Sequence, residues 1–142
     1  MGRVINVESA GKERTQLTRA IVVAMRELSQ QNDMDQKTRD LAAFMALALE
    51  EIASTIDISV AAWEKRGYWV KADRFRMDWI WTEKLGATMR KAVLEEDWAA
   101  VAITVGQVGQ KLNSVKVPQR NRVGTPWVGA YKQLSATHPG KD

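Results

Sequence analysis

Few residues of this 142-residue chain have side chains suited to catalysis. It contains no cysteine and a single histidine, His138, which excludes cysteine nucleophiles, disulfides and metal sites built from several histidines. The carboxylate pairs Glu50-Glu51 and Glu95-Glu96 are adjacent in sequence, and adjacent side chains on a helix diverge by about 100°. Asp57, between two isoleucines, is expected to be exposed or paired. We therefore expect no enzymatic activity, no cofactor and no bound metal.

One segment has a partial likeness to a phosphate-binding loop. Ser9-Ala10-Gly11-Lys12-Glu13 contains a glycine followed by a lysine, but a P-loop requires a glycine at the position of Asn6 and Ser or Thr at that of Glu13. The same segment suits the first turn of a helix that Ser9 caps. We favour the helical interpretation.

Basic charge is concentrated near the C-terminus. The chain has a net charge of +4, and residues 1–112 carry equal numbers of basic and acidic residues. The excess lies in residues 113–142, whose cations accompany Asn and Gln side chains that also suit phosphate contacts. We predict that this basic C-terminal arm binds nucleic acid, the alternative being a solvated linker. The predicted contacts are Lys116, Arg120, Arg122 and Lys132.

Aromatic and basic residues alternate in a second segment, residues 63–76. Nucleic-acid-binding surfaces combine the two types because cations neutralise phosphates and aromatic rings stack on bases. The alternative is a helical hairpin packed by aromatic residues, with the Lys and Arg stems reaching water. The second predicted nucleic-acid-binding set is Trp69, Lys71, Arg74 and Arg76.

The chain contains six tryptophans, each a large apolar group with one N–H donor. Trp63, Trp79 and Trp98 fall on the predicted inward stripes and are assigned to the core. Trp81 follows Trp79 by two residues, which places the two side chains about 200° apart on a helix. Trp81 is therefore predicted to face a partner, another subunit or the folded-back arm. The predicted partner contacts are Trp81, Trp127 and Tyr131.

Hydrophobic residues recur with helical spacing in four segments of residues 1–112. Asp33 or Asp35 is suited to cap the second segment, and Gly67 to end it. The fourth segment also contains β-branched residues and two glycines, which weaken a helix, so a β-strand is the alternative for this segment. The expected helices run from Ser9 to Leu28, from the Asp33 or Asp35 cap to Arg66, from Trp69 to Glu96 and from Trp98 to Leu112.

Helices of unequal length with short connections favour an all-α fold, an antiparallel up-and-down four-helix bundle. We assign this bundle domain to residues 1–112. Residues 113–142 form the basic arm, which is expected to be extended over residues 113–124. A short helix is predicted near residues 126–134, with Thr125 as its cap. The last eight residues are expected to be disordered.

Three functions are compatible with these features. The first, which we favour, is a non-enzymatic helical module that contacts nucleic acid or a nucleoprotein complex through the arm and the aromatic and basic face. The second is a protein-interaction or self-assembly module, a homo-oligomer included, with no nucleic-acid role. The third is an enzyme or small-ligand carrier with a pocket in an aromatic core. Because no apolar stretch reaches the length of a membrane span, we expect no membrane contact and a cytoplasmic location.

Overall fold

The computed structural model describes residues 6–137, and within that range the chain is helical and contains no β-strand. The predicted all-α class is confirmed. The fourth predicted segment, for which a β-strand was the alternative, is a helix. The six helices are α1 (Val7–Leu28), α2 (Gln36–Lys65), α3 (Trp69–Trp79), α4 (Trp81–Leu94), α5 (Trp98–Lys111) and α6 (Ala130–Ala136).

Local side chains determine where several helices begin. Asn6 caps α1, because its Oδ1 accepts the backbone N–H of Ser9 at 2.8 Å and its own N–H donates to the Ser9 hydroxyl. Ser9 is therefore the second member of a capping box, and its predicted role as the cap is wrong because the helix starts two residues earlier. Asp35 caps α2 by accepting the Thr38 N–H at 3.0 Å, and Asp97 caps α5 in the same way.

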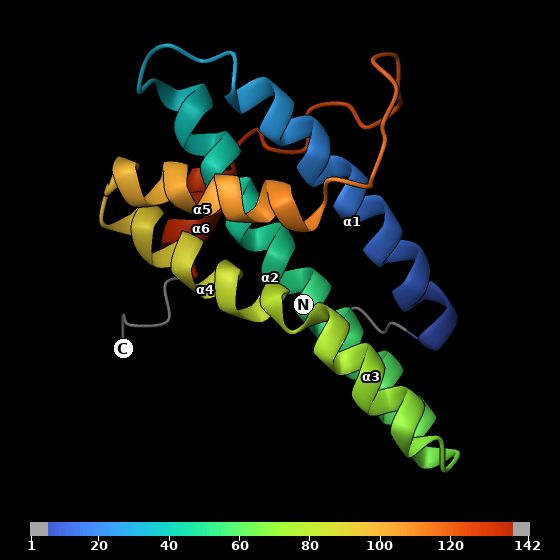
Figure 1. The fold of residues 1–142 in the computed structure, drawn as a ribbon. Coiled ribbons are helices and arrows are strands. Elements are labelled where there is room, and N and C mark those ends of the chain that lie inside the picture. The colour runs from blue at the N-terminus through green and yellow to red at the C-terminus, as the bar shows by residue number, and fades with distance from the viewer. Residues whose placement is uncertain (1–5, 138–142) are drawn as a thin grey trace.

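The longest helix, α2, is the centre of the fold. Helices α1, α3, α4 and α6 all pack against it, and α5 packs against α4 (Figure 1). The length of α2 explains this arrangement, because its 30 residues span about 45 Å and offer several faces to neighbours. An up-and-down four-helix bundle is not confirmed, since one helix is packed against four others. Fully buried side chains of α2 include Leu41, Met45, Leu49 and Ile52.

The segment predicted as one helix over residues 69–96 is broken at Ile80. The hydroxyl of the buried Thr82 donates to the Trp79 carbonyl at 2.8 Å, so a side chain satisfies a carbonyl at the end of α3. After the break, α4 packs closely against α2 at Gly86, where a Cβ would lie 3.2 Å from the nearest α2 atom. The prediction of a continuous helix is therefore wrong, because packing against α2 and the Thr82 hydrogen bond stabilise the break.

The break changes the relation between Trp79 and Trp81. Their ring centroids lie 6.2 Å apart with an interplanar angle of 20°, so the two rings stack. The predicted divergence of about 200° assumed a continuous helix and is wrong. Phe75 lies next to Trp79, and Trp63 of α2 meets Phe75 edge to face with centroids 4.8 Å apart. We call Trp63, Phe75, Trp79 and Trp81 the aromatic cluster.

The segment that connects α5 to α6, residues 112–129, contains no helix and packs against the helices. Val117 is buried, and the guanidinium of Arg26 in α1 donates to the carbonyls of Val117 at 2.7 Å and Pro118 at 3.5 Å. Trp127 is 5% exposed and belongs to the core. The segment therefore crosses the helices instead of reaching away from them.

The last helix lies further along the chain than predicted. Thr125 does not cap it; two turns follow Thr125, with the Val128 N–H donating to the Thr125 carbonyl. Helix α6 begins only after Gly129, whose φ of +82° lies in the left-handed region. It continues to Ala136, and Thr137 follows in a turn with hydrogen bonds to α6, so the disorder predicted from residue 135 is wrong for the first three residues. The rest of that prediction, from residue 138 onward, lies outside the described residues.

Candidate functional site

The four predicted cations of the arm lie at the surface. Lys116, Arg120, Arg122 and Lys132 are exposed, and none of them forms an ion pair within residues 6–137. Lys116 donates a hydrogen bond to the carbonyl of Asn113 at 3.4 Å, a neutral partner that leaves its charge uncompensated. The positive charge of the arm is therefore open to an anionic ligand.

A compact turn fixes the position of Arg122. The Asn121 amide donates to the carbonyl of Pro118 at 3.0 Å, and the Asn121 Oδ1 accepts the N–H of Val123 at 3.0 Å. Val123 packs against the core, and Gly124 then adopts a φ of +75°, which favours glycine. Arg122 therefore projects from a defined turn between two half-buried neighbours.

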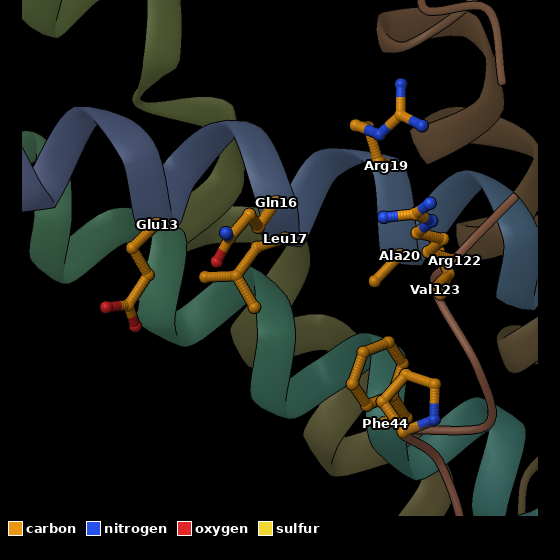
Figure 2. A pocket seen from close by; sticks show the side chains of 9 residues that line it. Glu13, Gln16, Leu17, Arg19, Ala20, Phe44, Arg122 and Val123 are labelled. Atoms are coloured by element: carbon orange, nitrogen blue, oxygen red, sulfur yellow. The ribbon is translucent and has the colours of Figure 1, made fainter.

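Arg122 shares a pocket with a second arginine, Arg19 of α1. The pocket has a volume of about 460 Å³ and lies between α1, α2 and the arm. Figure 2 shows both guanidinium groups at one end of the pocket and the carboxylate of Glu13 at the other. We call it the arginine pocket. Its lining residues are Glu13, Gln16, Leu17, Arg19, Ala20, Phe44, Arg122, Val123 and Pro126.

The sequence prediction did not include Arg19. It stands between the buried residues Thr18 and Ala20 in α1, and no motif distinguishes it from the other helical arginines. It forms no ion pair in the part of the chain that the structure describes. Only the folded-back arm, which brings Arg122 to the same pocket, identifies it. The sequence alone holds no signal that could have found this residue.

Three residues predicted to contact a partner make contacts within the chain. Trp127 is buried in the core, Tyr131 is half-buried against it, and Trp81 is half-buried in the aromatic cluster. Asp40 of α2 accepts the backbone N–H groups of Gly129 at 3.1 Å and Tyr131 at 2.9 Å. These contacts hold the end of the arm, so the arm forms one wall of the arginine pocket in a defined position.

The hairpin formed by α2 and α3 carries a second exposed surface at its turn. The hairpin projects from the rest of the molecule (Figure 1). We call residues 65–74 the hairpin tip. Within it, Tyr68, Trp69 and Val70 are 52%, 60% and 71% exposed. The exposed cations that flank these three side chains are Lys65, Arg66, Lys71 and Arg74.

The predicted nucleic-acid-binding residues of this hairpin differ in their contacts. Trp69 and Arg74 are exposed, and Arg74 forms no ion pair with any described residue. The ammonium of Lys71 lies 4.6 Å from the centroid of the Trp63 ring, so it already makes a cation–π contact within the chain. Arg76 forms ion pairs with carboxylates of α2 and α3, each at 3.6 Å. Trp69 and Arg74 are therefore the most accessible members of the predicted set.

Arg14 of α1 covers one side of the aromatic cluster. Its guanidinium carbon lies 4.9 Å from the ring centroid of Phe75 and 5.9 Å from that of Trp79. Its Nη1 donates to the Thr55 hydroxyl at 3.2 Å, and burial lowers the pKa of Arg14 from its ordinary value. Because a cation of the chain itself lies on these rings, we place the accessible rings at the hairpin tip.

Between residues 6 and 137 there is no group of three or more His, Cys, Asp or Glu residues that could hold a metal ion. None of the helices described is long and apolar enough to cross a membrane. The Glu50 carboxylate accepts two hydrogen bonds from Arg90, at 2.6 and 2.8 Å, which raise the pKa of Arg90.

Comparisons with protein-family models, with curated proteins and with solved structures find no match for this chain.

Proposed function

We propose that this protein is a non-enzymatic helical module that binds single-stranded nucleic acid. The observation that carries the proposal is the hairpin tip, where Tyr68 and Trp69 are exposed among cations. Proteins that bind single strands combine aromatic rings, on which bases stack, with cations that follow the phosphates. In a duplex the faces of the bases are stacked on one another and present only their edges in the grooves. The tip therefore favours unpaired bases.

The basic C-terminal arm supplies the second part of the proposed interface. Lys116, Arg120 and Arg122 are exposed cations without ion pairs in the described chain, and Lys132 extends the set onto α6. Contacts to phosphates position a strand without reading its sequence. Because the arm packs against α1, binding does not have to order it first. We therefore expect an affinity that depends strongly on salt and weakly on sequence.

Fluorescence anisotropy with labelled strands tests the role of the tip. We expect single-stranded RNA or DNA to bind more tightly than duplex DNA at low salt. Trp69→Ala should weaken binding about tenfold, because stacking on one base contributes about 1–3 kcal/mol. Met34→Ala is the matched control, since Met34 is 50% exposed but lies between α1 and α2, outside the tip. Equal weakening by both variants, or no binding of any strand at low salt, contradicts the proposal.

A double variant, Lys116→Ala with Arg120→Ala, tests the arm separately. Removing two phosphate contacts should reduce the slope of log K against log salt by about 1.4, since each contact to a single strand contributes about 0.7. Lys84→Ala with Lys91→Ala is the control, because it removes two exposed cations from α4. If both double variants change the slope by the same amount, the arm is not the contact surface.

A protein-interaction or self-assembly module is the second candidate. It is favoured by Val70 and Met77, which are 71% and 76% exposed and lie seven residues apart on one face of α3. Such a face suits contact with a second apolar helix. Size-exclusion chromatography with light scattering distinguishes this candidate. A monomer at high concentration, or an oligomer that Met77→Glu leaves intact, rules out self-assembly through this face.

A further inference from the structure

We infer that the arginine pocket binds a phosphate monoester carried on a nucleoside. This inference rests on the proposed function: if the protein binds single strands, the ligand is the phosphorylated end of a nucleic-acid strand. A free mononucleotide carries the same phosphate monoester, and a competition experiment distinguishes it from a strand end.

The charge at one end of the pocket favours an anionic ligand. Arg19 of α1 and Arg122 of the arm both line that end (Figure 2), and neither forms an ion pair within residues 6–137. Two cations that line one pocket repel each other, and an anion bound in the pocket relieves the repulsion. A phosphate monoester carries a charge of about −1.5 to −2 at pH 7. It therefore matches two arginines better than a singly charged carboxylate or an internal phosphodiester.

The geometry of the guanidinium donors favours a terminal phosphate. Each guanidinium presents its N–H groups as a planar fork that pairs with two phosphate oxygens at once. A terminal phosphate offers three acceptor oxygens, whereas an internal phosphodiester has only two that are not esterified. Two such forks in one pocket, one from Arg19 and one from Arg122, therefore favour the terminal group.

The remainder of the pocket suits a nucleoside. Its volume of about 460 Å³ falls within the range of about 300–1,000 Å³ that small-molecule sites occupy. Leu17, Phe44 and Pro126 form apolar surface on which a sugar and base can pack. Gln16, which Figure 2 shows between the Glu13 end and the arginine end, offers an amide donor and acceptor to the edge of a base. The pocket thus combines an anionic subsite with a nucleoside-sized apolar subsite.

The wall of the pocket that the arm forms is in place before any ligand binds. The turn at Asn121 fixes the backbone on both sides of Arg122. Arg26 holds the arm at Val117, and Asp40 holds it at Tyr131. A ligand therefore does not have to order this wall of the site, which lowers the cost of binding.

Three labelled strands of one sequence test the inference by anisotropy: one with a 5′-phosphate, one with a 3′-phosphate and one with hydroxyls at both ends. We expect one phosphorylated strand to bind about tenfold more tightly than the hydroxyl-terminated strand, the factor that one charge-assisted hydrogen bond provides. Arg19→Gln and Arg122→Gln should each reduce this ratio to about 1. Arg120→Gln is the control from the same arm, because Arg120 does not line the pocket and should weaken all strands equally.

Adenosine 5′-monophosphate and adenosine, used as competitors, separate the two sources of the ligand. If the nucleotide displaces the phosphorylated strand and adenosine does not, the pocket recognises the phosphate group of a free mononucleotide as well. Arg19→Lys keeps the charge at a half-buried position, so a partial phosphate preference in this variant shows that the preference depends on the positive charge of this side chain.

The outcomes distinguish this inference from the proposed function. Equal affinity for the three strands, with Trp69→Ala still weakening binding, overturns the inference and leaves the proposed function standing. If no strand binds at low salt, the proposed function fails, and calorimetric titration with adenosine 5′-monophosphate decides the inference alone. Binding that Arg122→Gln abolishes then supports the pocket, and absence of binding overturns it.

Discussion

The carboxylate of Asp40 in α2 accepts the backbone N–H of Tyr131 at 2.9 Å and so caps α6 from a position 91 residues earlier in the chain. Its second oxygen accepts the N–H of Gly129 at 3.1 Å, and the Gln36 amide donates to the first oxygen at 3.2 Å. Asp40 is only 6% exposed, and α6 has no side-chain cap of its own. A carboxylate that would be costly to bury without partners therefore accepts hydrogen bonds at both oxygens and serves as the N-terminal cap of α6.

Replacing Asp40 should loosen the arm and destabilise the protein. Asp40→Ala leaves two backbone N–H groups without their acceptor, and we expect the free energy of unfolding to fall by about 2 kcal/mol. Urea unfolding followed by tryptophan fluorescence measures the change. Asp57→Ala removes an exposed carboxylate from the same helix and should change stability by less than about 0.5 kcal/mol. If the two variants unfold at the same urea concentration, Asp40 does not hold the arm.

Helix ends could be predicted from the sequence where their signals are local. The Asp35 cap and the Gly67 stop both involve residues within one turn, and both are confirmed. Gly67 has a φ of +83°, the left-handed conformation in which glycine ends a helix at little cost. Interactions between neighbours in sequence leave a pattern that can be recognised without the fold.

Features that depend on distant contacts could not be predicted. Hydrophobic spacing continues through Ile80, so the sequence favours one helix where the structure has two. Asp40 looks like an ordinary polar helix residue, because its partners are backbone N–H groups far along the chain. At the candidate site, Arg122 could be identified from the charge of the arm. Arg19 became recognisable only when the arm was found packed against α1.

Two glycines in helices should respond to alanine in opposite ways. A Cβ at Gly86 would lie 3.2 Å from the Leu49 Cβ and 3.4 Å from the Glu50 nitrogen, both atoms of α2 that cannot move without shifting the helix. We expect Gly86→Ala to destabilise the protein by about 1 kcal/mol. Gly106 in α5 has no atom within 4 Å of the added Cβ. Gly106→Ala should therefore stabilise the protein by about 0.5–1 kcal/mol.

Urea unfolding of the two alanine variants at one pH and temperature makes the comparison, with the circular dichroism of each variant as the control for helix content. A shift of both midpoints to higher urea concentration would mean that α4 is not held closely against α2 at Gly86.

The Asp35 cap should make stability depend on pH in the acid range. The N–H of Thr38 donates to the Asp35 carboxylate at 3.0 Å and lowers the pKa of Asp35 below its ordinary value of 3.8. A carboxyl group with a lower pKa in the folded state binds fewer protons there than in the unfolded state at the same acid pH. Its contribution to stability is therefore complete above about pH 6, where this carboxyl group is ionised in the folded and the unfolded state alike, and is lost as the pH falls through the folded-state pKa.

Asp35→Asn isolates this contribution, because asparagine keeps an oxygen that can accept the Thr38 N–H but does not titrate. We expect the stability of the wild-type protein relative to Asp35→Asn to decrease between about pH 6 and about pH 3. Urea unfolding of both proteins across this range gives the difference directly, and every other carboxylate cancels in the comparison. Parallel stability curves would show that the Thr38 hydrogen bond does not favour the ionised form of Asp35.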